Sequence, residues 1–194
     1  MSHSPTPVKE LIDCIQSLHP LSSASLSALL SICKEVFYKK NAIIQEVGTS
    51  SRSLYFIKKG ALRVYYIKGK KEITDRLAFE NTFFANIQSM IPGMISHKGM
   101  MALEDSELIE INVDELGTLY DEHRDIERLF TMVLINSFIK ALKRIDSLQF
   151  YSAETRYLNL IKEHPDMLKR IQLKYIASYL GITQVSLSRI RAKY

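Results

Sequence analysis

The most informative stretch of the chain is Gln172-Leu-Lys-Tyr-Ile-Ala-Ser-Tyr-Leu-Gly-Ile-Thr-Gln-Val-Ser-Leu-Ser-Arg-Ile-Arg-Ala-Lys193. Its first half has apolar residues at i, i+3, i+4 and i+7, as on one face of a short helix. These residues are Leu173, Ile176, Ala177 and Leu180. Gly181 follows directly, and glycine readily adopts the left-handed conformation in which many helices end. The stretch therefore predicts a first helix that ends at a sharp turn.

A second helix is predicted to begin after this turn. Thr183 can cap its first turn through the side-chain hydroxyl, and Ile182 and Leu187 have the spacing of a hydrophobic staple. Leu187 and Ile190 would pack the second helix onto the first. Together the two segments predict a helix-turn-helix; the alternative is an ordinary helical hairpin with no role in DNA binding.

The second helix would present its outer face to the major groove of DNA. Gln184 could pair with an adenine edge and Arg189 with a guanine edge, with Val185 against a thymine methyl and Ser188 assisting. Phosphate contacts are expected from Lys174, Thr183, Ser186, Arg191 and Lys193.

The distribution of charge agrees with this prediction. Residues 150–194 contain 8 of the 26 Lys and Arg residues but only 3 of the 21 Asp and Glu residues, so they carry the whole formal net charge of +5. A basic unit attached to a neutral remainder is suited to neutralising phosphates. A disordered basic tail is the other explanation, but it would not carry apolar residues at helical spacing.

The middle of the chain predicts strands. Residues 53–57, 61–67, 72–79 and 108–111 alternate or are continuously apolar, with turn signals at Lys59-Gly60 and Lys68-Gly69-Lys70. Short strands at regular spacing indicate an antiparallel sandwich or roll. Residues 10–38, before them, are expected to form short helices that are broken near His19-Pro20.

A long helix is expected over about residues 122–149. It carries apolar residues at the 4-3-4-3 spacing of a coiled coil, namely Leu134, Phe138, Ala141, Ile145 and Leu148. We expect this stripe to pair two copies of the chain, although it could also pack within one copy. The predicted fold is α+β, with a β-roll domain over residues 10–120, a dimerisation helix over 121–149 and a DNA-binding domain over 150–194.

Composition limits the cellular location and the chemistry. The chain has two cysteines, Cys14 and Cys33, and neither a signal peptide nor an apolar run of membrane-spanning length. We expect a cytoplasmic protein with free thiols and no membrane partner. The five histidines are scattered without metal-ligand spacing, so no metal is expected, although a haem could use a single histidine. The sequence has no Gly-rich phosphate loop and no nucleophile motif, so an enzyme is not expected.

Two segments, in this order of elements, resemble the cyclic AMP receptor protein/Fnr (Crp/Fnr) family of bacterial transcription regulators. Ser53-Leu-Tyr-Phe-Ile-Lys-Lys-Gly-Ala-Leu-Arg-Val-Tyr65 resembles the strand–Gly–strand element of cyclic-nucleotide-binding domains, and residues 175–191 resemble the family's DNA-reading unit. The resemblance covers about residues 10–193. It implies a homodimer bound to a palindromic operator, with RNA polymerase as a further candidate partner. Any wing of the DNA-binding domain beyond the second helix would lie after Tyr194.

The family's cyclic AMP contacts are largely missing from this sequence. Ala85 and Asn86, after Phe84, stand where the family has Gly and Glu, and Ser96 and His97 stand where it has Arg and Ser. Arg binds a phosphate through two parallel hydrogen bonds that Ser and His cannot replace. Cyclic AMP is therefore not expected as a cofactor, whereas His97 and Lys98 could bind another small acidic effector or form a solvated loop. The alternative function is a small-molecule sensor or protein-interaction module that does not bind DNA.

Overall fold

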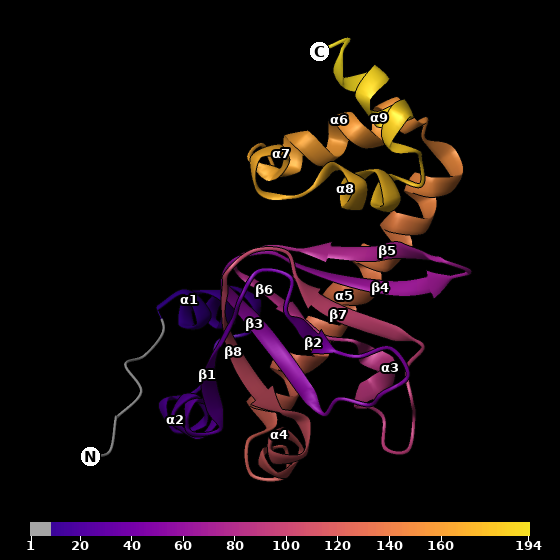
Figure 1. Ribbon diagram of the computed structural model, residues 1–194. Coiled ribbons are helices and arrows are strands. Elements are labelled where there is room, and N and C mark those ends of the chain that lie inside the picture. The colour runs from indigo at the N-terminus through magenta and orange to yellow at the C-terminus, as the bar shows by residue number, and fades with distance from the viewer. Residues whose placement is uncertain (1–8) are drawn as a thin grey trace.

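The computed structural model describes residues 9–194 and consists of a β-roll, a long helix along it and a C-terminal helical unit (Figure 1). The roll has two four-stranded antiparallel sheets, with strand orders β1-β8-β3-β6 and β2-β7-β4-β5. The strands are β1 (Cys33–Tyr38), β2 (Ile43–Gln45), β3 (Ser53–Lys59), β4 (Leu62–Lys68), β5 (Lys71–Ala78), β6 (Thr82–Phe84), β7 (Lys98–Ala102) and β8 (Ser106–Asn112).

Helices flank the roll and form the whole C-terminal unit. Around the roll they are α1 (Lys9–Leu18), α2 (Ser23–Ser31), α3 (Ile87–Met90) and α4 (Val113–Leu119), followed by the long α5 (Arg124–Phe150). The C-terminal unit contains α6 (Ala153–Glu163), α7 (Met167–Arg170), α8 (Leu173–Leu180) and α9 (Gln184–Arg191). No helix within residues 9–194 combines the length and apolar character needed to cross a membrane.

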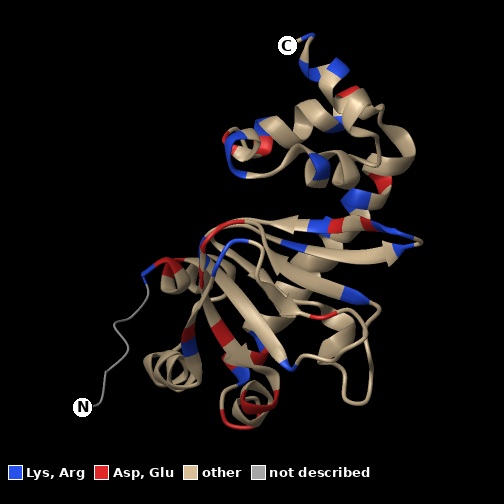
Figure 2. Cartoon of the chain, in the orientation of Figure 1, with Lys and Arg blue, Asp and Glu red and all other residues tan. Residues whose placement is uncertain are grey.

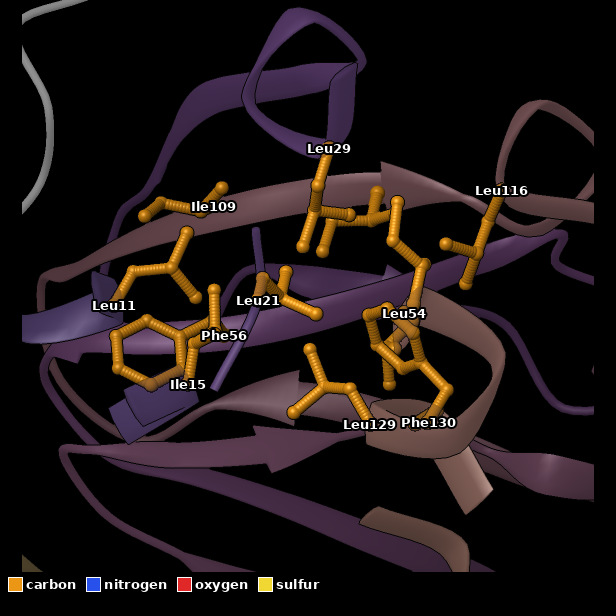
Figure 3. Close-up of a cluster of buried hydrophobic side chains, with 13 residues drawn as sticks. Leu11, Ile15, Leu21, Leu29, Leu54, Phe56, Ile109, Leu116, Leu129 and Phe130 are labelled. Carbon is orange, nitrogen blue, oxygen red and sulfur yellow. The ribbon is translucent and has the colours of Figure 1, made fainter. Parts of the chain in front are cut away.

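Alternation along the strands creates two cores on opposite faces of the first sheet. Ile57 and Leu108 face the roll interior, where they meet Val64 and Met100 of the second sheet. The neighbouring residues of the same strands face outward and form a second core with the flanking helices (Figure 3). This core contains Leu54, Phe56, Ile109 and Ile111 from the sheet and Leu11, Ile15, Leu29, Leu116, Ile126, Leu129 and Phe130 from α1, α2, α4 and α5. It fixes the first two turns of α5 against the roll.

The predicted α+β fold is confirmed, and the helix expected over residues 122–149 is present as α5. The expectation of helices throughout residues 10–38 is wrong at its C-terminal end, because Cys33–Tyr38 forms β1. This strand pairs along its whole length with β8, from Cys33 opposite Ile111 to Tyr38 opposite Ser106. Its side chains Val36 and Tyr38 pack against the roll interior, so a partner strand distant in sequence determines its conformation.

Candidate nucleic-acid interface

The two C-terminal helices α8 and α9 are joined by the predicted glycine turn. Gly181 has a φ of 70°, in the left-handed region, and the amide of Ile182 donates to the carbonyl oxygen of Ala177 at 3.0 Å. Thr183 then caps α9, because its hydroxyl accepts a hydrogen bond from the amide of Ser186 at 3.1 Å. The turn and the cap together fix the angle between the two helices.

A closed apolar core holds α9 in place. Ile176, Ala177 and Leu180 of α8 and Leu187 of α9 are almost completely buried. They belong to one cluster with Tyr157 and Leu160 of α6. The second helix therefore has one fixed inner face, and its other residues are directed away from the core.

The outer face of α9 is open to solvent. Gln184, Val185, Ser188 and Arg189 are all exposed, and Val185 is exposed over 62% of its surface although it is apolar. Lys174 and Arg191 are exposed as well, while Ser186 is half-buried beside the Thr183 cap. Lys193 is exposed but pairs with Glu154, with 3.2 Å between its Nζ and Oε2. The structure thus brings the candidate base-contacting residues onto one surface of a single helix.

Basic side chains recur through this C-terminal unit (Figure 2). Two of them, Arg144 of α5 and Arg156 of α6, bind the last carbonyl oxygens of α8. Arg144 Nη2 donates to the Tyr179 oxygen, and Arg156 donates to the Leu180 oxygen through Nε at 3.1 Å and Nη2 at 2.9 Å. Cations are favoured at a helix C-terminus, where carbonyl groups lack partners within the helix. These two arginines therefore have a structural role in holding α8.

The long helix α5 exposes its predicted apolar stripe. Phe138 is 64% exposed, Leu134 53%, Ile145 49% and Leu148 45%, and Ala141 is also exposed. Ile135, Ile139 and Leu142 add a parallel exposed row. An apolar surface of this extent is typical of an interaction site.

The candidate effector residues are largely buried and hydrogen-bonded to one another. Asn86 Nδ2 donates to the carbonyl oxygen of Lys98 at 3.0 Å, and Ser96 Oγ donates to Asn86 Oδ1 at 3.2 Å. The Lys98 amide in turn donates to Ser96 Oγ at 3.1 Å. Phe84 and Ala85 are buried beside this network, whereas His97 is exposed. The polar groups that would meet an effector are therefore already paired within the protein.

Comparison with known proteins identifies the roll. The family model described as "cyclic nucleotide-binding domain" matches residues 35–123. Residues 35–123 of the roll are thus similar to a cyclic nucleotide-binding domain. A search of the curated proteins found no match to the chain.

Solved structures extend the likeness beyond the cyclic nucleotide-binding domain. FixK2 from Bradyrhizobium japonicum is 18% identical with a TM-score of 0.71, over 84% of this chain and 84% of FixK2. The c-di-GMP responsive global regulator CLP from Xanthomonas campestris is 14% identical with a TM-score of 0.68, over 89% of this chain and 91% of CLP. Catabolite activator protein from Thermus thermophilus is 21% identical with a TM-score of 0.56, over 91% and 84%. The chain thus has the fold of the Crp/Fnr transcription regulators.

Two cations of the roll lie close to the candidate effector residues, and the sequence indicated only one of them. Lys98 is the first residue of β7 and does not lie in a solvated loop. Its Nζ pairs with Asp75 Oδ2 at 2.9 Å. Arg76, which the sequence did not single out, lies 3.8 Å from the same oxygen through Nε and donates to the Ala85 carbonyl at 2.6 Å. Burial lowers the pKa of Arg76, and the Asp75 carboxylate opposes this effect. Arg76 pairs with Val64, which faces the roll interior, and the alternation of residues along β5 did not reveal this pairing.

Within residues 9–194, no group of three or more His, Cys, Asp or Glu side chains has an arrangement that could hold a metal ion. The two cysteines, Cys14 and Cys33, are free thiols. Burial raises the pKa of the Cys33 thiol to about 12. This thiol is therefore protonated at neutral pH, which makes it a poor nucleophile.

Proposed function

We propose that the protein is a homodimeric, sequence-specific DNA-binding transcription regulator of the Crp/Fnr type. The observation that carries the proposal is the outer face of α9, where Gln184 and Arg189 are exposed on a helix whose inner face is locked by Leu187. Amide and guanidinium groups on one helix face match the donor and acceptor pattern of base edges in the major groove.

The dimer follows from α5 in this proposal. Two copies would bury the stripe Leu134, Phe138, Ala141, Ile145 and Leu148 against each other. A two-fold axis along this seam would present two α9 helices to half-sites about one DNA turn, or about 34 Å, apart. The operator would then be a palindrome, and RNA polymerase is the partner through which binding would alter transcription.

The cyclic nucleotide-binding domain would not use cyclic AMP. A cyclic phosphate needs charge-assisted donors when it leaves water, but Asn86 and Ser96 are occupied by each other and by the Lys98 backbone. Any effector would be a different small acidic molecule, and Arg76 and Lys98 are the cations that could meet it.

Selection of bound fragments from a random duplex DNA pool, with no ligand added, tests the proposal. We expect a two-fold symmetric motif, and we expect a steep loss of affinity with increasing salt. Arg189→Ala should relax the preference at one base step by about 1–3 kcal/mol. Lys34→Ala, which removes one positive charge from β1 in the roll, is the matched control and should leave the motif unchanged.

A sensor or protein-interaction module that does not bind DNA is the alternative function. It is favoured by the exposed apolar Val185, which could equally pack against a protein. Failure to recover any motif, together with DNA binding that is insensitive to Arg189→Ala, would support this alternative.

A further inference from the structure

The C-terminal unit is covalently connected to α5 and also packs directly onto the second sheet of the roll. Helix α8 lies along β5 (Figure 1), and the Thr74 amide of β5 donates to Ser178 Oγ of α8 at 2.8 Å. Ala61, Phe79 and Leu103 of the roll belong to the same apolar cluster as the core of the helix-turn-helix. We call this contact the roll seam and define it by Arg63, Thr74, Phe79, Glu80 and Glu104 on the roll and His164, Arg170, Tyr175 and Ser178 on the C-terminal unit.

Arg170 is the main ionic contact across the roll seam. Its guanidinium binds two carboxylates of the roll at once, with Nε 3.0 Å from Glu104 Oε1 and Nη1 3.2 Å from Glu80 Oε2. All three side chains are only about one-quarter to one-third exposed. Burial raises the pKa of Glu80, but hydrogen bonds from Arg170 and from the Gly60 amide outweigh it and bring this pKa below its ordinary value. Glu80 is therefore held as a carboxylate that pairs with Arg170.

Arg63 is a second, fully buried contact. Its guanidinium carbon lies 4.4 Å from the ring centroid of Tyr65 and 3.9 Å from that of Tyr175, and a nitrogen of the group binds Glu72. The side chain of Arg63 is 0% exposed. Tyr65 lies on the same strand as Arg63, so the attraction between the guanidinium and the Tyr175 ring is the part of this contact that depends on α8. This contact therefore specifies one position of α8 on the sheet.

The roll seam leaves the outer face of α9 free. Gln184 and Arg189 are exposed and do not belong to the roll seam. Lys174, a candidate phosphate contact, lies with Nζ 4.7 Å from the ring centroid of Tyr175. The ring that Arg63 contacts is therefore directly next to a residue expected at the DNA surface.

The roll seam is separate from the candidate effector residues. Its residues differ from the buried network of Asn86, Ser96 and Lys98, whose polar groups are paired within the protein.

We propose that Arg63 and Arg170 are positioning residues, which hold the helix-turn-helix against its own roll in one orientation and so preset α9 for DNA. The proposal rests on the proposed function of α9 as the DNA-reading helix. If the roll seam opens, only a fraction of molecules presents α9 correctly, and the apparent affinity falls by that fraction.

The double variant Glu80→Gln/Glu104→Gln tests the proposal in the full-length chain. The amide introduced by Glu80→Gln keeps an oxygen that can accept from the Gly60 amide, so the turn between β3 and β4 is preserved while the ionic contact is lost. The matched control is Glu107→Gln/Glu115→Gln, which removes two carboxylates of the first sheet and α4 that pair with Lys58 and Lys34.

Hydrogen exchange at the Thr74 amide measures the roll seam directly, because its acceptor Ser178 lies on the other side. We expect strong protection in the wild type without DNA or ligand. Exchange at Thr74 should be at least about tenfold faster in Glu80→Gln/Glu104→Gln, whereas the amides of β3 paired with β8 should keep their protection. The control variant should match the wild type at Thr74.

DNA affinity supplies the second readout. Removing two negative charges by itself strengthens binding to phosphates, so the change in charge alone would leave affinity equal or increased. We expect the opposite, a loss of about tenfold in Glu80→Gln/Glu104→Gln, with Arg170→Lys intermediate because Lys keeps the charge but not the planar fork.

Unchanged exchange at Thr74 in the double variant would overturn the proposal. So would fast exchange at Thr74 with undiminished DNA affinity, because the roll seam would then have no influence on α9. Absence of DNA binding in the wild type would instead refute the proposed function and, with it, the role of the roll seam in presetting α9. Protection of the Thr74 amide would still decide whether the roll seam holds the C-terminal unit against the roll.

Discussion

Phe138→Ser should dissociate the proposed dimer while leaving the protomer folded. A phenylalanine side chain buries about 150–250 Å², and Phe138 is 64% exposed in the single chain. Covering that part in a dimer would remove about 100–160 Å² from water, worth about 2.5–4 kcal/mol per copy at about 25 cal/mol per Å². A two-fold interface uses the residue twice. Even if the partner covers only half of the exposed ring, Phe138 would contribute about 3 kcal/mol to the dimer, and its loss would raise the dimer dissociation constant about 100-fold.

Sedimentation velocity over a concentration series measures this effect, with thermal unfolding as a check on the protomer. Phe37→Ser is the matched control, because Phe37 is 53% exposed on β1, in the first sheet. Phe37→Ser should change neither the dimer dissociation constant nor the melting temperature by more than a small amount. An unchanged dissociation constant for Phe138→Ser, or an equal effect of Phe37→Ser, would refute the assignment of the α5 stripe to the dimer.

Three further substitutions or conditions test the C-terminal unit and the helices around the roll. Gly181→Ala should destabilise the protein by about 1–2 kcal/mol in denaturant titrations. The added carbon would lie 3.5 Å from Leu148 and so has room, but the φ of 70° is unfavourable for alanine. No loss of stability would mean that the turn rearranges. Burial lowers the pKa of His164 below 6.5, and its ring stacks on Phe79 with 4.0 Å between centroids, so stability present at pH 7.5 should fall as the pH drops below about 6.5. Melting curves of His164→Gln should lack this part of the pH dependence, and identical profiles for both proteins would contradict it. A hydrogen bond from Ser25 lowers the pKa of Asp125 to about 2. The contribution of this carboxylate to stability is therefore complete above pH 3.8 and is lost only as the pH falls toward 2. Acid titrations of Asp125→Asn should lack this loss of stability.

The C-terminal unit could be predicted because its signals are local. The apolar spacing from Leu173 to Leu180, the glycine at 181 and the cap at 183 all act within a few residues of one another, and each forms as expected. The exposure of the stripe on α5 likewise follows from the spacing of residues in one helix, although its role in dimerisation stays a prediction.

The features that the sequence did not reveal depend on distant partners. Strand β1 exists because β8, more than sixty residues later, pairs with it. Arg63 reads as a surface residue of a strand, but its side chain is buried, with Tyr175 of the C-terminal unit against it. Asp75 of β5 likewise pairs with Lys98 of β7, which is distant in sequence, and lies beside Arg76. Periodicity predicts which face a residue occupies, but it does not identify which residue of another element covers that face.

The attachment of α8 to Arg144 and Arg156 bears on how C-terminal helical units could be exchanged between proteins of this fold. The carbonyl groups that end α8 are held by an arginine from the long helix and another from α6. A helix pair transplanted into this chain would meet those two guanidinium groups and would need a terminus of matching position. Conversely, residues 152–194 moved alone to another protein would leave Arg144 behind. A transferable unit that keeps the contacts at the end of α8 therefore includes part of the long helix, so its boundary lies before Arg144 and not at the chain segment between α5 and α6.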